Sequence, residues 1–152
     1  MIVMERLPKR RRARGSRLIE ALIVITVMLG IAVILAPKET GDRMNANEMA
    51  VIRELQTINT MQVEYKSKFQ RFATTLAELG ADGADLIPSA LASGDKDGYA
   101  FTLAVTPSGY TINANPKVYN STGRRTFFSD QTMICRQNWS PEPANASSPE
   151  IK

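Results

Sequence analysis

The stretch Gly15-Ser16-Arg17-Leu18-Ile19-Glu20, followed by the apolar run of residues 21–36 and then by Pro37, decides how the rest of the chain is organised. Residues 21–36 contain no charged side chain. A helix from Leu18 to Pro37, rising about 1.5 Å per residue, would cover roughly 30 Å, which is the thickness of the hydrocarbon core of a bilayer. The sequence therefore predicts one membrane-spanning helix near the N-terminus.

The charges around this segment predict its orientation. Residues 1–15 hold six Lys and Arg side chains and a single acid, Glu5. A basic flank stays on the cytoplasmic side of a membrane, so we expect everything after Pro37 to be exported. Glu20 stands near the start of a segment otherwise suited to lipid, where an ionisable group is costly and indicates a functional role.

Together, these residues resemble the prepilin signal of type IV pilins and type II secretion pseudopilins. In that family a prepilin peptidase in the membrane removes a short basic leader after its final Gly, and the new first residue is N-methylated. The resemblance implies cleavage between Gly15 and Ser16 and methylation of Ser16. Glu20 is then the fifth mature residue and Pro37 the twenty-second, where the family usually has Glu and Pro. Pro37 would kink or end the helix, because its ring removes a backbone donor.

Two positions differ from the family's usual pattern. Its mature chains usually begin with Phe or Met followed by Thr or Ser, whereas here Ser16 is followed by Arg17. Arg17 lies three residues before Glu20, within reach on one helical turn, so it could partly neutralise that carboxylate. Its long side chain could equally extend to the membrane surface and serve only as an anchor.

The sequence predicts four segments. Residues 1–15 form a leader, residues 16–37 a helix for the membrane and for the core of a filament, residues 38–140 a periplasmic pilin-like domain, and residues 141–152 a disordered tail. The 115 residues after Pro37 are enough for one hydrophobic core and not for two. The tail is assigned as disordered because its small, polar and Pro residues have no means of building a core.

Residues 45–69 predict an amphipathic helix after a polar juncture at residues 38–42. The motif Asn45-x-x-Glu48 fits a capping box, so we expect this helix to begin near Asn45. Apolar side chains then recur at helical spacing on one face, with Gln62 in the gap. These are Ile52, Leu55, Ile58, Tyr65 and Phe69.

The remainder predicts short helical turns and then a sheet. Helical turns are expected at residues 75–80 and 89–93, and strands at residues 99–105, 110–114, 125–128 and 132–136. The predicted fold class is α+β. It consists of a long N-terminal helix, half membrane anchor and half amphipathic, packed on a C-terminal antiparallel sheet of about four strands. The pilin resemblance implies the same architecture.

The composition argues against several classes of function. The chain has no His, which removes the commonest general base and metal ligand. A single Cys135 cannot form an internal disulfide or a Cys-based zinc site. The formal net charge of +4 belongs mostly to the leader, since residues 16–152 hold 13 basic and 14 acidic side chains, so nucleic acid is not indicated. We find no catalytic constellation, and we expect no enzymatic activity and no cofactor.

Asp95 and Asp97 are weak candidates for a metal site. The motif Asp95-Lys96-Asp97-Gly98 is similar to the opening of a calcium loop, but it lacks a third ligand position and the distal bidentate Glu. A tight turn before the strand at residue 99 is the better interpretation.

The resemblance implies a structural subunit of a type IV pilus or a pseudopilus. The expected partners are the bacterial inner membrane, the prepilin peptidase, the pilus assembly platform and other pilin or pseudopilin subunits. In a bundle of like helices, Glu20 would pair with the free amine of Ser16 on a neighbouring subunit and so set the register. Such a pair is worth on the order of 4 kcal/mol before desolvation.

Two alternatives to a filament subunit stay open from the sequence. One is a single-pass envelope domain with an uncut signal anchor, and the other is a secreted domain released by cleavage after Ala36. Neither would polymerise. Within the pilin resemblance, the choice between major pilin, minor pilin and pseudopilin, and the process that the filament serves, are open as well.

Overall fold

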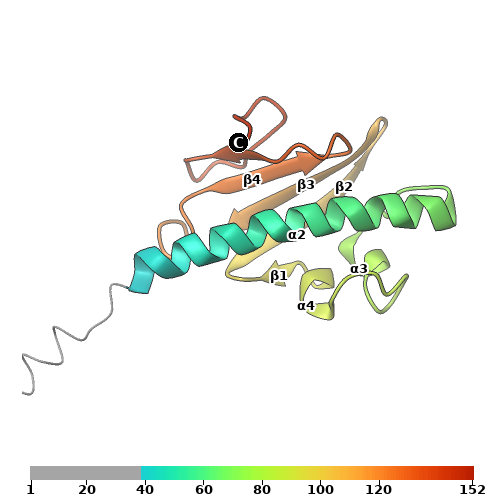
Figure 1. Ribbon diagram of the computed structural model, residues 1–152, viewed down its shortest axis with the longest axis horizontal. Helices are drawn as coiled ribbons and strands as arrows, with labels where there is room; N and C mark the ends of the chain where they lie inside the picture. The colour runs from blue at the N-terminus through green and yellow to red at the C-terminus, as the bar shows by residue number, and fades with distance from the viewer. Residues whose placement is uncertain (1–38) are drawn as a thin grey trace, which may run out of the picture. The chain divides into compact units, whose positions relative to one another are not determined.

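The computed structural model describes the backbone of residues 39–152 and their side chains from residue 41 onward. The predicted leader, cleavage site and membrane segment lie outside the described residues. Within residues 39–152, no helix is both long enough and apolar enough to cross a membrane. The described elements follow the order α2, α3, α4, β1, β2, β3, β4 and β5 (Figure 1).

The long helix α2 (Glu39–Phe69) has one face that is apolar at helical spacing. Val51, Leu55 and Ile58 on this face are completely buried, and Tyr65 is nearly so. The predicted amphipathic helix is therefore confirmed over its central part. Phe69 differs from the prediction: it is 51% exposed, and its ring lies against that of Tyr65, at 4.5 Å between centroids.

The start of α2 differs from the sequence prediction. The helix is already formed at Glu39, so it runs through Asn45 without a cap there and includes residues 39–42, which were expected to form a polar juncture. Glu48 does not cap the helix either, because its carboxylate is buried and binds residues far along the chain. The predicted capping box of Asn45 and Glu48 therefore does not form. Glu48 instead binds Arg124 and Arg125.

Two short helices follow α2 as predicted. In α3 (Leu76–Leu79) the backbone N–H of Glu78 donates to the hydroxyl of Thr75 at 3.3 Å, and the helix stops at Gly80. The second short helix is α4 (Ser89–Ala92). α3 contacts both α2 and α4, and α4 contacts the first strand. These turns bury Leu76, Leu79 and Leu91 against the end of α2.

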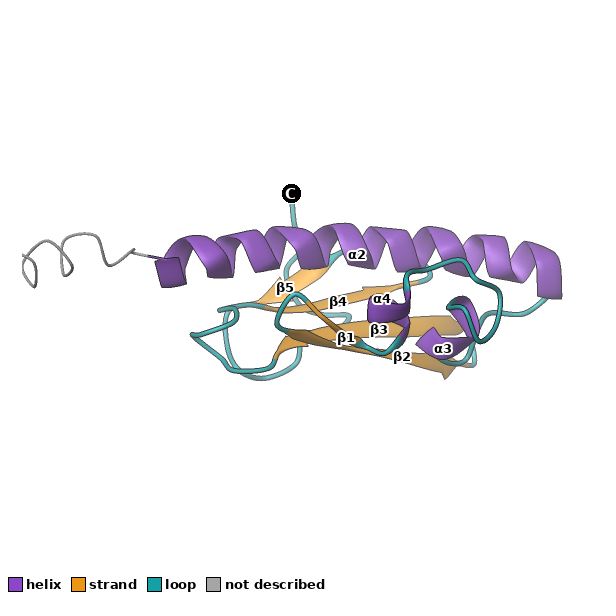
Figure 2. Cartoon of the chain, turned by 90° about the horizontal axis from the view of Figure 1, so that it is seen from below, coloured by secondary structure: helices purple, strands orange, loops and turns teal. Residues whose placement is uncertain are grey.

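The sheet is an antiparallel meander in which each strand pairs with the next one in sequence. It has five strands where about four were predicted: β1 (Asp95–Lys96), β2 (Tyr99–Thr106), β3 (Gly109–Pro116), β4 (Thr126–Asp130) and β5 (Arg136–Asn138). The sheet forms one layer and α2 lies lengthwise across it as the other (Figure 2). The α+β prediction is confirmed at this level.

Alternation along the strands places one face of the sheet against α2. In β2, Tyr99, Phe101 and Leu103 are buried while the residues between them are exposed. The strand β3 continues this face with Ile112 and Ala114. The tight turn before β2 is present as predicted, since Asp97 and Gly98 have positive φ angles of 51° and 75°. At the other end of β2, residues 106–109 close the β2–β3 hairpin.

The prediction of a last strand at residues 132–136 is wrong. The carboxylate of Asp130 accepts hydrogen bonds from the backbone N–H and the hydroxyl of Thr132, at 2.9 and 2.6 Å, which closes a turn. Met133 then has a φ angle of 64°, which no strand accommodates. The strand β5 starts only at Arg136, where the chain returns to β4.

The prediction of a disordered tail at residues 141–152 is also wrong. This segment folds back along β5: the backbone N–H of Gln137 donates to the carbonyl of Pro149, and that of Ile151 donates to the carbonyl of Cys135, both at 2.9 Å. Ala144 is only 2% exposed. The segment has no core of its own but is held by backbone groups of the sheet.

Candidate functional site

The outer face of α2, opposite the sheet, is the part of the described surface most directly linked to the predicted assembly function. Between residues 44 and 63 only one charged side chain, Arg53, is exposed. The other two charged residues of that span, Glu48 and Glu54, are engaged with partners described below. Met49 and Val63 are 54% and 48% exposed on the same span. This part of the outer face is therefore poor in charge.

The threonines of this face are satisfied within the helix. The hydroxyl of Thr57 donates to the carbonyl of Arg53 at 3.0 Å, and that of Thr60 donates to the carbonyl of Gln56 at 2.9 Å. Their hydroxyl hydrogens are thus used locally, and methyl groups contribute to the surface. A partner packing here would not have to replace these two hydrogen bonds.

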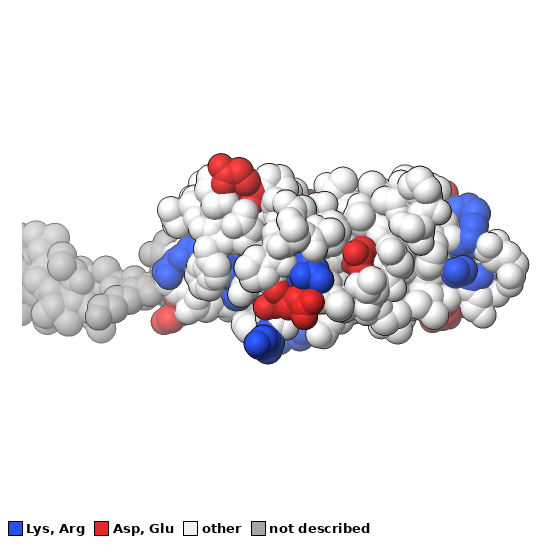
Figure 3. All heavy atoms as spheres, turned by 90° about the horizontal axis from the view of Figure 1, so that it is seen from above, with Lys and Arg blue, Asp and Glu red and all other residues white. Residues whose placement is uncertain are grey.

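The last turns of α2 differ from this outer face. Lys68 pairs with Glu64 at 2.7 Å, and Lys66, two residues before Lys68, is exposed. Charges of both signs are also interspersed on the face of the molecule that Figure 3 shows, without a patch of a single sign. The charge-poor span thus ends near Val63.

A buried ion pair fixes the loop of residues 117–125 to the early turns of α2. Glu48 is 2% exposed, and its carboxylate accepts from the backbone N–H of Arg124 at 2.7 Å and from Nε of Arg125 at 2.8 Å. Arg125 also donates to the side chain of Gln137 at 2.6 Å. Asn47 adds a hydrogen bond to the carbonyl of Thr122 at 2.9 Å. These contacts make the loop, the helix and β5 one structural unit.

A second polar link joins the middle of α2 to the sheet. The side chain of Asn59 donates to the hydroxyl of Ser129 at 2.8 Å and accepts from the hydroxyl of Tyr110 at 2.9 Å. Burial raises the pKa of Tyr110 to about 12. The fully buried Gln62, predicted only as a gap in the apolar face, binds both the N–H and the carbonyl of Ala73, at 2.9 and 3.1 Å.

Asp95 and Asp97 do not form a common ligand set. Asp95 in β1 forms an ion pair with Lys117, and Asp97 belongs to the tight turn between β1 and β2. Their neighbour Lys96 binds Glu54 of α2. Within residues 39–152, no group of three or more His, Cys, Asp or Glu side chains could hold a metal ion. The turn interpretation of this motif is confirmed.

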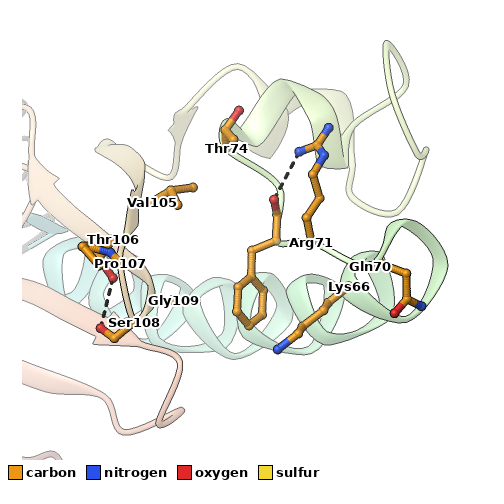
Figure 4. Close-up of a pocket in the computed structure, with 10 residues that line it drawn as sticks. Lys66, Gln70, Arg71, Thr74, Val105, Thr106, Pro107, Ser108 and Gly109 are labelled. Atoms are coloured by element: carbon orange, nitrogen blue, oxygen red, sulfur yellow. Dashed lines mark hydrogen bonds between the residues drawn. The ribbon is translucent and has the colours of Figure 1, made fainter.

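A hollow of about 410 Å³ lies between the end of α2 and the β2–β3 hairpin (Figure 4). Its cations are engaged: Arg71 binds Glu78 at 2.9 Å, and the ammonium of Lys66 lies 4.5 Å from the ring centre of Phe72. The lining contains no carboxylate, His or Cys. The residues are Lys66, Gln70, Arg71, Phe72, Thr74 and residues 105–109. This hollow therefore offers no acid and base pair for catalysis.

Cys135 is partly buried and free. It lies just before β5 and not on a strand, whereas the predicted strand at residues 132–136 would have included it. Burial raises the pKa of its thiol, which disfavours the reactive thiolate.

The predicted site residues at the N-terminus fall outside the described residues: Gly15 and Ser16 at the cleavage site, Glu20 and Pro37. Compared with known protein families, curated proteins and solved structures, the chain matches none of them.

Proposed function

We propose that this chain is a structural subunit of a type IV pilus or a pseudopilus. In this proposal residues 16–37 hold the subunit in the bacterial inner membrane, and the domain is exported. A prepilin peptidase cleaves after Gly15, and the freed subunit then enters a filament through its N-terminal helix. Glu20 pairs with the amine of Ser16 on a neighbouring subunit.

The observation that carries the proposal is the placement of α2. This helix begins at Glu39, two residues after the predicted membrane segment, and extends lengthwise over an antiparallel sheet (Figure 1). A helix that follows a membrane anchor in the chain and presents one face to its own sheet has its opposite face available for like helices. The charge-poor outer face between residues 44 and 63 supports that use, because helices that pack together bury few charges.

The first experiment is to measure the N-terminal sequence and intact mass of the native protein extracted from membranes. The proposal expects a chain that begins at Ser16, with or without one added methyl group. A chain that begins at Met1 would instead indicate an uncut signal anchor, and one that begins at Pro37 a secreted domain. Either of these results would overturn the filament subunit.

Two variants test the assembly step itself. Glu20→Ala should insert and be cleaved normally but enter filaments poorly, because the Ser16 amine of the neighbour loses its partner. Met49→Glu places a charge on the outer face and should also reduce incorporation, while Ser67→Glu, on the charged end of the same helix, should not. Sheared filaments and membrane fractions are compared by immunoblot. Normal incorporation of Glu20→Ala and Met49→Glu would contradict the proposal.

A further inference from the structure

Trp139, the only tryptophan of the chain, is exposed at the end of the sheet next to the start of α2. It follows β5, which ends at Asn138 opposite Thr126, the first residue of β4. The side chain is 62% exposed. Val118, in the preceding loop, is 57% exposed. Together with Tyr119 these residues form what we call the Trp139 edge.

The Trp139 edge is held in place by bonds beneath it. The guanidinium of Arg125 lies 5.1 Å from the ring centre of Trp139 and is itself fixed by the buried Glu48. The hydroxyl of Tyr119 donates to the carbonyl of Trp139 at 3.0 Å. Arg125 and Tyr119 therefore hold the Trp139 ring in one position at the surface. Within the described residues 39–152, no contact covers its exposed part.

The Trp139 edge belongs to the end of the domain at which the chain enters α2, only a few residues after the predicted membrane segment in sequence. The loop of residues 117–125 lies against the first turns of α2 (Figure 1), and the guanidinium of Arg124 is 3.7 Å from the position that a Cβ on Gly41 would occupy. Gly41 is four positions after Pro37, which is at most about 14 Å even in fully extended chain. If residues 21–36 lie in a bilayer, a connection this short allows this end of the domain to reach the membrane surface.

Trp and Tyr rings concentrate at membrane–water interfaces, where an apolar ring and a polar edge are both accommodated. The Trp139 edge has this composition, and the exposed Arg124 beside it can extend its charge to the water. Asp42 and Arg43 are both exposed near the same end and offset each other, so Arg124 adds only one net charge and the apolar contacts should matter more than net charge.

We propose that the Trp139 edge inserts into the interfacial layer of the lipid bilayer while the subunit is anchored there. This inference rests on the membrane anchoring in the proposed function. It adds a second contact that orients the domain on the membrane before assembly.

The test uses the full chain reconstituted into phosphatidylcholine vesicles. Because Trp139 is the only tryptophan, its fluorescence reports this edge alone. We expect emission at shorter wavelength than in urea-unfolded chain, a loss of intensity with lipids brominated at acyl carbons near the headgroup, and little quenching by aqueous iodide. Added salt should leave the quenching by brominated lipid unchanged, since the contact is mainly apolar.

The matched control moves the reporter to the opposite end of the sheet. Val105 pairs with Tyr110 beside the β2–β3 hairpin and is 50% exposed. The double variant Trp139→Phe and Val105→Trp therefore carries one exposed tryptophan far along β2 from the Trp139 edge. Its emission should be quenched by iodide and not by brominated lipid.

The outcomes separate the two proposals. A chain that floats with vesicles while Trp139 escapes quenching by brominated lipid overturns the lipid contact and leaves the filament proposal intact. Equal quenching of both reporters, or protection from iodide that grows with protein concentration without lipid quenching, also overturns the contact. The second of these results would identify another copy of the chain as the partner. A chain that does not float with vesicles overturns membrane anchoring and both proposals with it.

Discussion

Replacing Glu48 by Ala should destabilise the domain strongly. The change removes the acceptor of two hydrogen bonds, from the backbone N–H of Arg124 and from Nε of Arg125, at a position that is 2% exposed. The side chain of Arg125 is itself only 15% exposed, so its charge would stay largely out of water without an anionic partner. Breaking a buried pair by removing one partner costs about 3–5 kcal/mol, and the partial exposure of Arg125 places this case near the lower end, at about 3 kcal/mol.

Urea denaturation of residues 38–152, which form a compact unit, measures this loss. With a denaturant slope of about 2 kcal/mol per M, a loss of about 3 kcal/mol lowers the midpoint by about 1.5 M. Trp139 fluorescence follows the transition, and circular dichroism provides a second signal, because Arg125 lies over the Trp139 ring and could change its emission locally.

The matched control is Glu64→Ala, which breaks the exposed pair with Lys68. That pair should be worth about 0.3–0.5 kcal/mol, so the midpoint should move by about 0.2 M. If Glu48→Ala shifts the midpoint no more than Glu64→Ala does, the buried pair does not hold the loop and our reasoning is refuted. The double variant Glu48→Leu with Arg125→Met should recover part of the loss, since neither charge is then left buried.

Three further predictions concern other contacts of the domain. A hydrogen bond from Arg71 lowers the pKa of Glu78 from 4.5 to about 2, so this carboxylate stabilises the fold above about pH 4.5 and loses that effect as the pH falls towards 2. In Glu78→Gln, the free energy of unfolding should therefore fall by about 1 kcal/mol less over that pH range, a small amount because solvent screens the pair. Urea midpoints measured against pH would show this difference, and an unchanged pH dependence would count against the assignment. Gln62→Leu leaves both backbone groups of Ala73 unpaired in the core and should lower the free energy of unfolding by about 2 kcal/mol, whereas a neutral result would mean that water replaces the amide. Cys135 should react with maleimide at neutral pH much more slowly in the folded protein than in urea, because burial raises the pKa of its thiol; equal rates would show that it is open to solvent.

The sequence was most informative where local pattern and tertiary packing agree. The spacing of Leu55, Ile58 and Tyr65 predicts a helical face that the sheet then buries. The Asp97-Gly98 turn follows from residues that tolerate positive φ angles. In both cases the information lies within a few residues, so one sequence is enough.

Two predictions, those for the tail and for Glu48, failed because contacts distant in sequence decide the structure. The tail is held by the amide of Asn113, which donates to the carbonyl of Ala144 at 2.8 Å, and by the hydroxyl of Thr126, which donates to the carbonyl of Glu142 at 2.8 Å. Nothing in the composition of the tail indicates these donors. Glu48 is similar, because a helical carboxylate three residues after an Asn fits a cap until its partners from residues 124 and 125 are known.

The folded tail also determines what the open side of β5 offers to other chains. An uncovered strand edge presents unpaired N–H and C=O groups that template intermolecular pairing. Here Pro149 and Ile151 bond to the backbone beside β5, and Arg136 adds an ion pair with Glu150 at 3.0 Å. A truncation before residue 141 would uncover that edge, and the shortened protein should aggregate through strand addition. An affinity tag is therefore best appended after Lys152, with the native tail left whole.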